Sequence, residues 1–287
     1  MSKPIFKVDS GICAPCAIKN KSKAKFKTCY SKESLIKIAN IWNKHNSSDT
    51  KMIDTKNKSI KVIWDQIHKK FSAKCKKNEA CWKRDPLIKK MRDPEITMYT
   101  FKPDFPKVWK KNKYTWLNTY DIYYVMKQYE KAYDDFIFLG PIPSDCPTKI
   151  KCELTKLDLI GMKKNNFNKV GIIYNLDISS GQGTHWVAMY IDNKNNEINY
   201  YDSYGSKPVP LINNFIKSLV DKYTEHNFKS TVIYNDKRHQ YGHSECGVYS
   251  MNFILERLHG TTMYDISQVN IPDKKMNHLR KLLYNLN

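Results

Sequence analysis

The sequence has no apolar run of about 18 residues, the length that a membrane-spanning helix requires. Its first residues, MSKPIFKVDSGICAPC, also lack the apolar core of a secretory signal peptide. We therefore expect a soluble intracellular protein without a membrane span. The 287 residues, of which 41% are hydrophobic and 13% aromatic, suffice for one large folded domain or two smaller ones. This composition excludes a chain that is disordered throughout.

Arginine is scarce, because it accounts for five of the 49 basic residues in a chain of formal net charge +21. Arginine grips phosphate through paired hydrogen bonds, whereas lysine acts as a point charge. The charge is also uneven, since residues 1–100 hold 24 Lys and Arg against 9 Asp and Glu, which is a net charge of +15. The pattern is compatible with diffuse, non-specific contact of residues 1–112 with nucleic acid, and it disfavours a sequence-reading site. The favoured alternative is that the many Lys, Asn and Ile residues reflect an AT-rich genome.

Paired cysteine motifs are also scarce among the eight cysteines. Cys13 and Cys16 form a CxxC pair, and Cys29 follows at a spacing that zinc sites use. The candidates for a fourth zinc ligand are Cys75, Cys81 and His45. A single CxxC pair is a weak zinc signal, so we expect no metal site and no cofactor, with zinc as the alternative. Without a secretory signal a disulfide framework is disfavoured, and we expect reduced thiols.

The first part of the chain has helical periodicity. Apolar residues recur every three or four positions in a segment that Ser31 can cap, and again in residues 60–71 and 78–91. Residues 92–112 contain three prolines and many lysines, which is typical of a linker or a strap over a surface. We place a domain boundary there. This predicts a basic, mostly helical N-terminal arm domain at 1–112 and a second domain at 113–287.

The second domain begins with a helix that Asn118 or Thr119 can cap, and then its periodicity changes to two. The segments VGIIYNLDI, THWVAMYID, INYYDSYG and STVIYND are predicted strands, and turn-forming residues separate the first three. PLINNFIKSLVDKY and the end of QYGHSECGVYSMNFILERL are amphipathic helices. This order predicts an α+β fold with a central, mostly antiparallel sheet flanked by helices.

A candidate nucleophile stands at the start of the last predicted helix. Cys246 precedes the apolar stripe of that helix, and a helix N-terminus offers partial positive charge and free N–H groups. Both favour the ionised thiol, which is the nucleophilic form. Gly247 follows directly and permits close approach of a substrate backbone. The alternative is that Cys246 is a small core residue near a helix start.

A thiol nucleophile needs a base, and His185 is the favoured histidine because it begins a strand directly after a glycine turn. His239 and His243 lie nearer to Cys246 in sequence, but on an irregular loop and without an evident orienting acid. Asp202 ends the neighbouring strand, and cross-strand neighbours lie within about 5 Å of each other.

Another acid can be set aside. Asp192 lies at the far end of the strand that His185 begins, and is therefore less suitable than Asp202 as the orienting acid. One further residue completes the candidate site. Gln240, six residues before Cys246, can offer its amide to an oxyanion, with the backbone N–H of Cys246 as the second donor.

In this order, GTHWVAMYID, YYDSYG and Q-x5-C-G resemble the adenain and Ulp-type cysteine proteases, as does WLNTYDI upstream. These enzymes act on viral polyproteins or on ubiquitin-like modifiers. Within this class the chain resembles the polyprotein-processing protease of African swine fever virus and related large DNA viruses. The resemblance covers about residues 113–287. Residues 1–110 match only in size and position the helical arm domain of the swine fever enzyme.

The resemblance implies an Ulp/adenain-like core with an N-terminal helical arm, and a thiol-dependent endopeptidase that requires no cofactor. It assigns Cys246 as nucleophile, His185 as general base and acid, Asp202 as the orienting acid, and Gln240 as oxyanion donor. Related viral enzymes can carry Asn at the position of Asp202. The resemblance also implies that Trp116 and Trp186 form a narrow slot that admits Gly-Gly, although core packing is the alternative for each tryptophan.

We therefore expect a monomeric endopeptidase that cuts viral structural polyproteins after Gly-Gly-like motifs during virion maturation. It would act in the host cytoplasm, at the viral factory, and in the virion. Three alternatives stay open. The site can serve an isopeptidase that removes ubiquitin or SUMO-like modifiers from host conjugates, or an acyltransferase that is acetylated on Cys246. The protein can also be a binding protein with a vestigial site, an interpretation that the complete set of four site residues disfavours.

Overall fold

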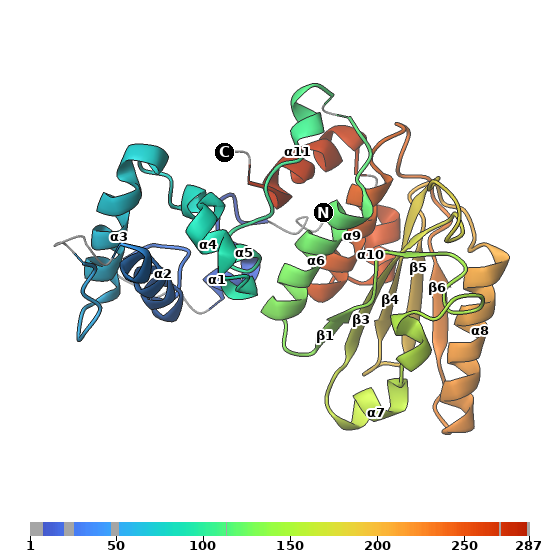
Figure 1. Ribbon diagram of the computed structural model, residues 1–287. Coiled ribbons are helices and arrows are strands. Elements are labelled where there is room, and N and C mark those ends of the chain that lie inside the picture. Colours follow the sequence, from blue (N-terminus) through green and yellow to red (C-terminus); the bar gives the residue numbers. More distant parts are fainter. Residues whose placement is uncertain (1–7, 20–25, 47–51, 113, 270, 286–287) are drawn as a thin grey trace. The chain divides into compact units, whose positions relative to one another are not determined.

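The computed structural model describes residues 8–19, 26–46, 52–112, 114–269 and 271–285 (Figure 1). The described residues form two compact units, of which one lies within residues 10–104 and the other within residues 105–285 together with residues 8–9. The two units meet between Asp104 and Phe105, slightly before the boundary expected at residue 112. The division into an arm domain and a core at residue 112 stays a prediction. No helix in the described parts of the chain is long and apolar enough to cross a membrane.

The first unit is helical, as its periodicity predicts. Ser31 caps the helix that follows it by accepting a hydrogen bond from the backbone N–H of Ser34. The core lies around Trp82, which is fully buried and stacks on Tyr30 with ring centroids 5.4 Å apart. The helices are α1 (Pro15–Ile18), α2 (Lys32–His45), α3 (Ile60–Cys75), α4 (Pro86–Lys90) and α5 (Pro94–Thr97), with a 3-10 helix at Glu79–Arg84.

One expectation for this region is wrong. The helix expected over residues 78–91 is interrupted at Asp85, whose backbone is extended because Pro86 follows it. The carboxylate of Asp85 then caps α4 by accepting from the N–H of Leu87. The segment 92–112, expected to be a linker or a strap over a surface, contains the short helix α5 and a 3-10 helix at Lys107–Lys110, and the division between the two units falls within it.

The expectation of reduced thiols is also wrong, because the structure contains disulfides at Cys13–Cys29, Cys75–Cys81 and Cys146–Cys152. Their Cα atoms lie 5.2, 5.5 and 6.1 Å apart, within the range that disulfides span. Cys13 and Cys29 are bonded to each other and are therefore not the zinc ligands that their spacing suggests. Cys16 donates a hydrogen bond to the carbonyl oxygen of Tyr99. The absence of a secretory signal predicts reduced thiols but does not reveal which thiols the fold brings together.

The second unit is built on a six-stranded sheet in the order β1-β3-β4-β5-β6, with β2 also paired to β3. The strands are β1 (Phe136–Phe138), β2 (Ile142–Pro143), β3 (Lys169–Asn175), β4 (Trp186–Asp192), β5 (Glu197–Tyr201) and β6 (Thr231–Tyr234). The α+β class with helices flanking a sheet is confirmed. The sheet is mixed, however, because β3, β4 and β5 pair antiparallel while β1, β2 and β6 join in parallel.

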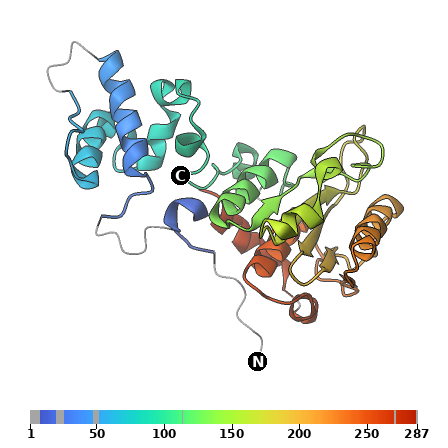
Figure 2. The ribbon, with the colours of Figure 1, turned by 90° about the horizontal axis from the view of Figure 1, so that it is seen from below.

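Helices cover both faces of this sheet (Figures 1 and 2). On one face the core contains residues of α7 (Leu159–Lys164) and α8 (Pro210–Glu225). On the other face it contains residues of α6 (Thr119–Ala132), α9 (Cys246–Leu258), α10 (Met263–Gln268) and α11 (Asp273–Leu283). Every residue of α9 is buried, which makes this helix the centre of that core and fixes the position of its first residue.

Candidate active site

The site is organised around the start of α9. Cys246 is the first residue of this helix and is 2% exposed. The first N–H groups of a helix have no acceptor within the helix, and the helix dipole places partial positive charge at this end. Both stabilise a thiolate at Cys246. The structure therefore puts this thiol where its sequence position predicts.

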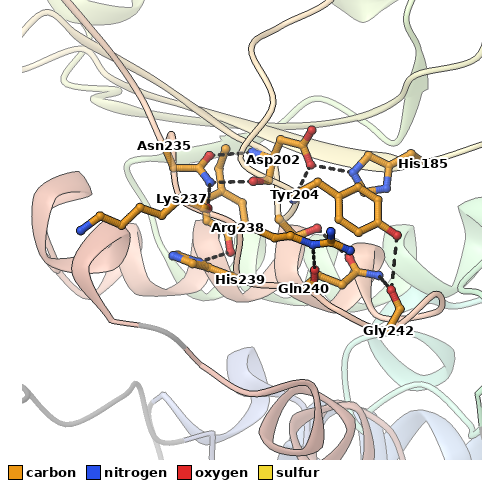
Figure 3. Close-up of polar contacts among 11 residues, drawn as sticks. His185, Asp202, Tyr204, Asn235, Lys237, Arg238, His239, Gln240 and Gly242 are labelled. Atoms are coloured by element: carbon orange, nitrogen blue, oxygen red, sulfur yellow. Dashed lines mark hydrogen bonds and ion pairs between the residues drawn. The ribbon is translucent and has the colours of Figure 1, made fainter.

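His185 lies just before β4, and its ring nitrogen Nε2 is 2.7 Å from Oδ1 of Asp202, which follows β5. The backbone around Asp202 is itself held by the side-chain amide of Asn235 (Figure 3). Asn235 accepts from the N–H of Asp202 at 2.8 Å and donates to its carbonyl oxygen at 2.6 Å. This pair of hydrogen bonds fixes the carboxylate toward the imidazole.

The imidazole of His185 also interacts electrostatically with Cys246. Burial by itself lowers the pKa of His185, but the hydrogen bonds and charges of Asp202 and Cys246 outweigh burial and raise the pKa to about 9. The ring is therefore protonated at neutral pH and can act as a proton donor. The fold brings together three of the predicted catalytic residues in the order that acid, base and nucleophile require.

Gln240 is fully buried on the loop that leads to α9. Its Oε1 accepts from the hydroxyl of Ser203 at 2.7 Å, and its Nε2 donates to the carbonyl oxygen of Gly242 at 3.0 Å. An amide nitrogen carries two hydrogens, so the second remains available to an oxyanion. The neighbour of Ser203 is Asp202, and the loop of Gln240 is therefore tied to the segment that orients His185.

Tyr204 and Arg238 belong to this cluster, although sequence reasoning missed both. The ring of Tyr204 stacks on the imidazole of His185 with centroids 4.6 Å apart, and its hydroxyl donates to Gly242 at 3.3 Å (Figure 3). The guanidinium of Arg238 lies 5.1 Å from the ring centroid of Tyr204 and 5.0 Å from that of Tyr241. Tyr204 lies in the motif YYDSYG, two residues after Asp202. Its position in this motif could have predicted that its side chain lies near His185.

The two predicted tryptophans line one pocket of about 450 Å³ beside the thiol-bearing helix. Trp116 is 45% exposed and is therefore not a core residue. Trp186 is buried, and its indole N–H donates to the carbonyl oxygen of Leu117 at 2.9 Å, which fixes the ring. The other lining residues include Pro141, Pro143, Asn175, Asp177 and Gly183.

Gly247 packs tightly against the same region. A Cβ at this position would lie 3.1 Å from Cδ1 of Leu117 and 3.3 Å from Cδ1 of Trp186, which is closer than ordinary contact. The missing side chain therefore allows Leu117 and the indole to approach the start of α9. That Gly247 also admits the substrate backbone stays a prediction.

The candidates that the sequence disfavours are engaged elsewhere. Nδ1 of His239 lies 2.9 Å from the hydroxyl of Tyr201, and burial lowers the pKa of His239. Asp192 lies 3.9 Å from the guanidinium of Arg257. Neither contact involves Cys246 or His185.

Known cysteine proteases are similar to this chain in sequence. Residues 160–287 match the model of the Ulp1 protease family, C-terminal catalytic domain. A protein of Acanthamoeba polyphaga mimivirus named as a thiol protease is 28% identical over 274 residues, which is 90% of this chain and 89% of that protein. Cysteine proteases of African swine fever virus are 29% identical over 126 residues, which is 43% of this chain and 46% of each of those proteins.

The fold extends the likeness beyond the matched sequence. The crystal structure of the African swine fever virus protease has a TM-score of 0.65 to this chain, covers 98% of both chains and is 19% identical. At that identity the match concerns the fold. It includes the helical region before the sheet as well as the sheet and its flanking helices.

Proposed function

We propose that this chain, which belongs to the Ulp1 family of cysteine proteases, is a viral endopeptidase that cuts structural polyproteins after Gly-Gly-like motifs. The observation that carries the proposal is the hydrogen bond of His185 to Asp202, in a histidine that also interacts electrostatically with Cys246 at the start of a buried helix. The relatives from mimivirus and African swine fever virus support a viral role. Its action in the host cytoplasm and in the assembling virion, as a monomer, is part of the proposal.

The chemistry follows from the placement of the groups. The thiolate of Cys246 attacks the scissile carbonyl carbon, and the oxyanion accepts hydrogen bonds from the backbone N–H of Cys246 and the side-chain amide of Gln240. The imidazolium of His185 gives its proton to the departing amine as the C–N bond breaks. Water then attacks the thioester carbonyl while His185 takes its proton, and the carboxylate product and the thiol are released.

The aromatic pocket supports the Gly-Gly preference. A substrate that passes between Trp116 and Trp186 meets an indole held rigidly by its hydrogen bond to Leu117. Glycine presents no Cβ to such a wall, and two glycines in succession give the narrowest polypeptide. The same geometry serves a ubiquitin-like tail, and several swine fever relatives are named as SUMO-1 cysteine proteases. An isopeptidase is therefore the second candidate function.

Labelling of the thiol tests the proposal. A Gly-Gly vinyl sulfone should add once to the wild-type protein, as read by intact mass. Cys246→Ala should gain no adduct and His185→Ala much less. Cys16→Ala, which removes another thiol, is the matched control and should react as the wild type does. An adduct on Cys246→Ala would contradict the assignment.

Turnover of two substrates separates the two candidate functions. The two substrates are a quenched fluorescent peptide with an internal Gly-Gly sequence and a fluorogenic ubiquitin or SUMO conjugate, and we expect faster cleavage of the peptide. Faster cleavage of the conjugate would favour the isopeptidase, and faster cleavage of an internal Gly-Gly sequence favours the endopeptidase.

The proposal includes non-specific contact of residues 1–112 with nucleic acid. Its support is the net charge of +15 over residues 1–100, although part of that charge lies outside the described residues. Retardation of DNA by the full chain should weaken steeply with added salt, because such binding releases counterions. Retardation that persists at high salt would argue against simple charge attraction.

A further inference from the structure

A second pocket, which we call the cationic cleft, lies in the same unit as the active site. It has a volume of about 1160 Å³ and is lined by parts of the segment 105–114 and of α11. Its charged residues have one sign, because none of the described lining residues is Asp or Glu. They are Lys110, Lys274, Lys275, Arg280 and Lys281, and the lysines are exposed.

The other wall of the cationic cleft is aromatic. Trp109 is buried and packs edge-on against Phe105 at 4.6 Å, which gives the cleft a rigid floor. Tyr114 is 61% exposed and adds an aromatic surface that a ligand can reach. A ligand that fits both walls carries negative charge together with at least one apolar side chain.

The cationic cleft is linked through neighbouring residues to the pocket that Trp116 and Trp186 line, which we call the substrate pocket. Tyr114 lines the cleft, and Trp116 lines the substrate pocket two residues later. Arg280 connects the two, because its guanidinium donates to the carbonyl oxygen of Thr115 and to that of Ser244, which precedes Cys246 by two residues. The same guanidinium lies 4.9 Å from the ring centroid of Trp109 at the floor of the cleft.

We propose that the cationic cleft is an exosite that binds an acidic segment of the polypeptide substrate, anchored by one aromatic or aliphatic side chain. This inference rests on the proposed protease function and names a feature of its substrates. An extended chain advances about 3.3 Å per residue, so a few residues suffice to cross the strip between the two pockets. The lysines from position 274 to position 281 of α11 span roughly 10 Å along the helix axis, the length of about three extended residues.

The observations favour a polypeptide over nucleic acid. Arginine is the side chain that grips phosphate in a fork, but both terminal nitrogens of Arg280 donate to main-chain carbonyls. The indole of Trp109 is buried and cannot stack on a base. The lysines that remain act as point charges, which suit carboxylates spread along a peptide.

Paired peptide substrates test the exosite on the full chain. Each pair has the same Gly-Gly cleavage sequence and differs in a segment of Glu, Asp and Phe that is replaced by Gln, Asn and Phe in the partner peptide. The segment is placed before the cut in one pair and after it in the other. In one placement the acidic peptide should show a kcat/KM about five- to tenfold higher at low salt, mainly through KM, as expected for a few exposed charge pairs.

Charge reversal of the lysines tests whether the higher kcat/KM of the acidic peptide depends on the cationic cleft. In Lys274→Glu/Lys275→Glu the advantage of the acidic peptide should disappear, while turnover of a short Gly-Gly peptide stays unchanged. Lys194→Glu/Lys217→Glu, two exposed lysines that do not line the cleft, is the matched control and should keep the advantage. Tyr114→Ala should weaken the binding of acidic peptides that contain Phe more than the binding of acidic peptides that contain Ala in place of Phe.

Three results would overturn the exosite. These are equal kcat/KM for both peptides of each pair, an equal loss in the control double variant, or displacement of the acidic peptide by a single-stranded oligonucleotide whose binding Lys274→Glu/Lys275→Glu weakens and the control double variant does not. Fluorescence anisotropy of the labelled acidic peptide, without cleavage, keeps the test independent of catalysis. If no Gly-Gly peptide is cut but the acidic peptide binds and Lys274→Glu/Lys275→Glu abolishes binding, the proposed function fails while the acidic-peptide site stands.

Discussion

The imidazole of His185 lies nearly parallel to the ring of Tyr204, with centroids 4.6 Å apart and planes inclined by 14°. Asp202 holds the edge of the same imidazole through Nε2 at 2.7 Å. The histidine is therefore fixed by a hydrogen bond in its plane and by a ring against its face. Arg238 supports Tyr204 from the other side, with its guanidinium carbon 5.1 Å from the ring centroid.

Removal of the stacked ring should impair catalysis. We expect Tyr204→Ala to lower kcat by roughly 10- to 100-fold, because loss of orientation by about 1 Å can cost that much. Tyr204→Phe keeps the ring and loses only the hydroxyl, and should stay within about threefold of the wild type, since that hydroxyl makes a weak hydrogen bond. Steady-state kinetics separate kcat from KM, and an unchanged kcat in Tyr204→Ala would remove the positioning role.

Activity should have an alkaline limb near pH 9. Burial lowers the pKa of His185, but Asp202 and Cys246 outweigh burial and raise the pKa to about 9, so the proton donor is lost above that pH. Because the folded pKa lies above the ordinary value of 6.5, the stability that this group contributes is fully present below pH 6.5 and is lost as pH rises through 9.

The pH dependence of kcat/KM and of Tm measures both effects. Asp202→Asn removes the negative charge and should move the alkaline limb to lower pH. Asp192→Asn, at the far end of β4, should leave it in place. An alkaline limb that does not respond to Asp202→Asn would mean that His185 is not the titrating group.

Loss of the Gln240 amide should slow the chemical step. We expect Gln240→Ala to lower kcat by about 10²- to 10³-fold, the usual effect of losing one oxyanion donor. Ser203→Ala breaks the hydrogen bond to Oε1 of Gln240 but leaves the amide hydrogens, and serves as the control with a much smaller loss. Alkylation of Cys246 by iodoacetamide should proceed in both variants, because it forms no oxyanion. A normal kcat in Gln240→Ala would assign the oxyanion to other donors.

A methyl group at position 247 should disturb the wall of the substrate pocket. In Gly247→Ala the new Cβ would lie 3.1 Å from Leu117 and 3.3 Å from Trp186, so both must shift. We expect a loss of about 1–3 kcal/mol in the free energy of unfolding, as overpacking usually costs. Denaturant unfolding measures this loss. Leu117→Ala in the same chain should recover part of it, whereas purely additive losses would show that these residues do not share the space.

Much of the secondary structure and the positions of the candidate residues can be predicted from the sequence. The capping box that Asn118 forms with Asp121 and the cap at Ser31 follow from local chemistry, as do the strands that place His185 and Asp202 at their ends. The motif around Cys246 sets the thiol at a helix start for the same reason. Each of these features depends on residues a few positions apart, or on one pair of neighbouring strands.

Features that join distant segments could not be predicted in this way. The register of β4 and β5 pairs Ala188 with Tyr201, and continuing the same count past both strands sets His185 opposite Tyr204. The stacked ring is therefore a consequence of register, which periodicity does not give. Asn235 reaches Asp202 from beyond β6, and the parallel pairing of β5 with β6 is what brings it there.

By itself, the sequence determined the candidate site residues and their local structure, because caps, strand alternation and helix starts are encoded within short stretches. The tertiary structure decided how these residues are held: the partners of the cysteines, the Asn235 clamp, the Tyr204 stack and the cationic cleft beside the substrate pocket. The physical reason is that packing and pairing join segments tens of residues apart, and local residue preferences leave those contacts unspecified.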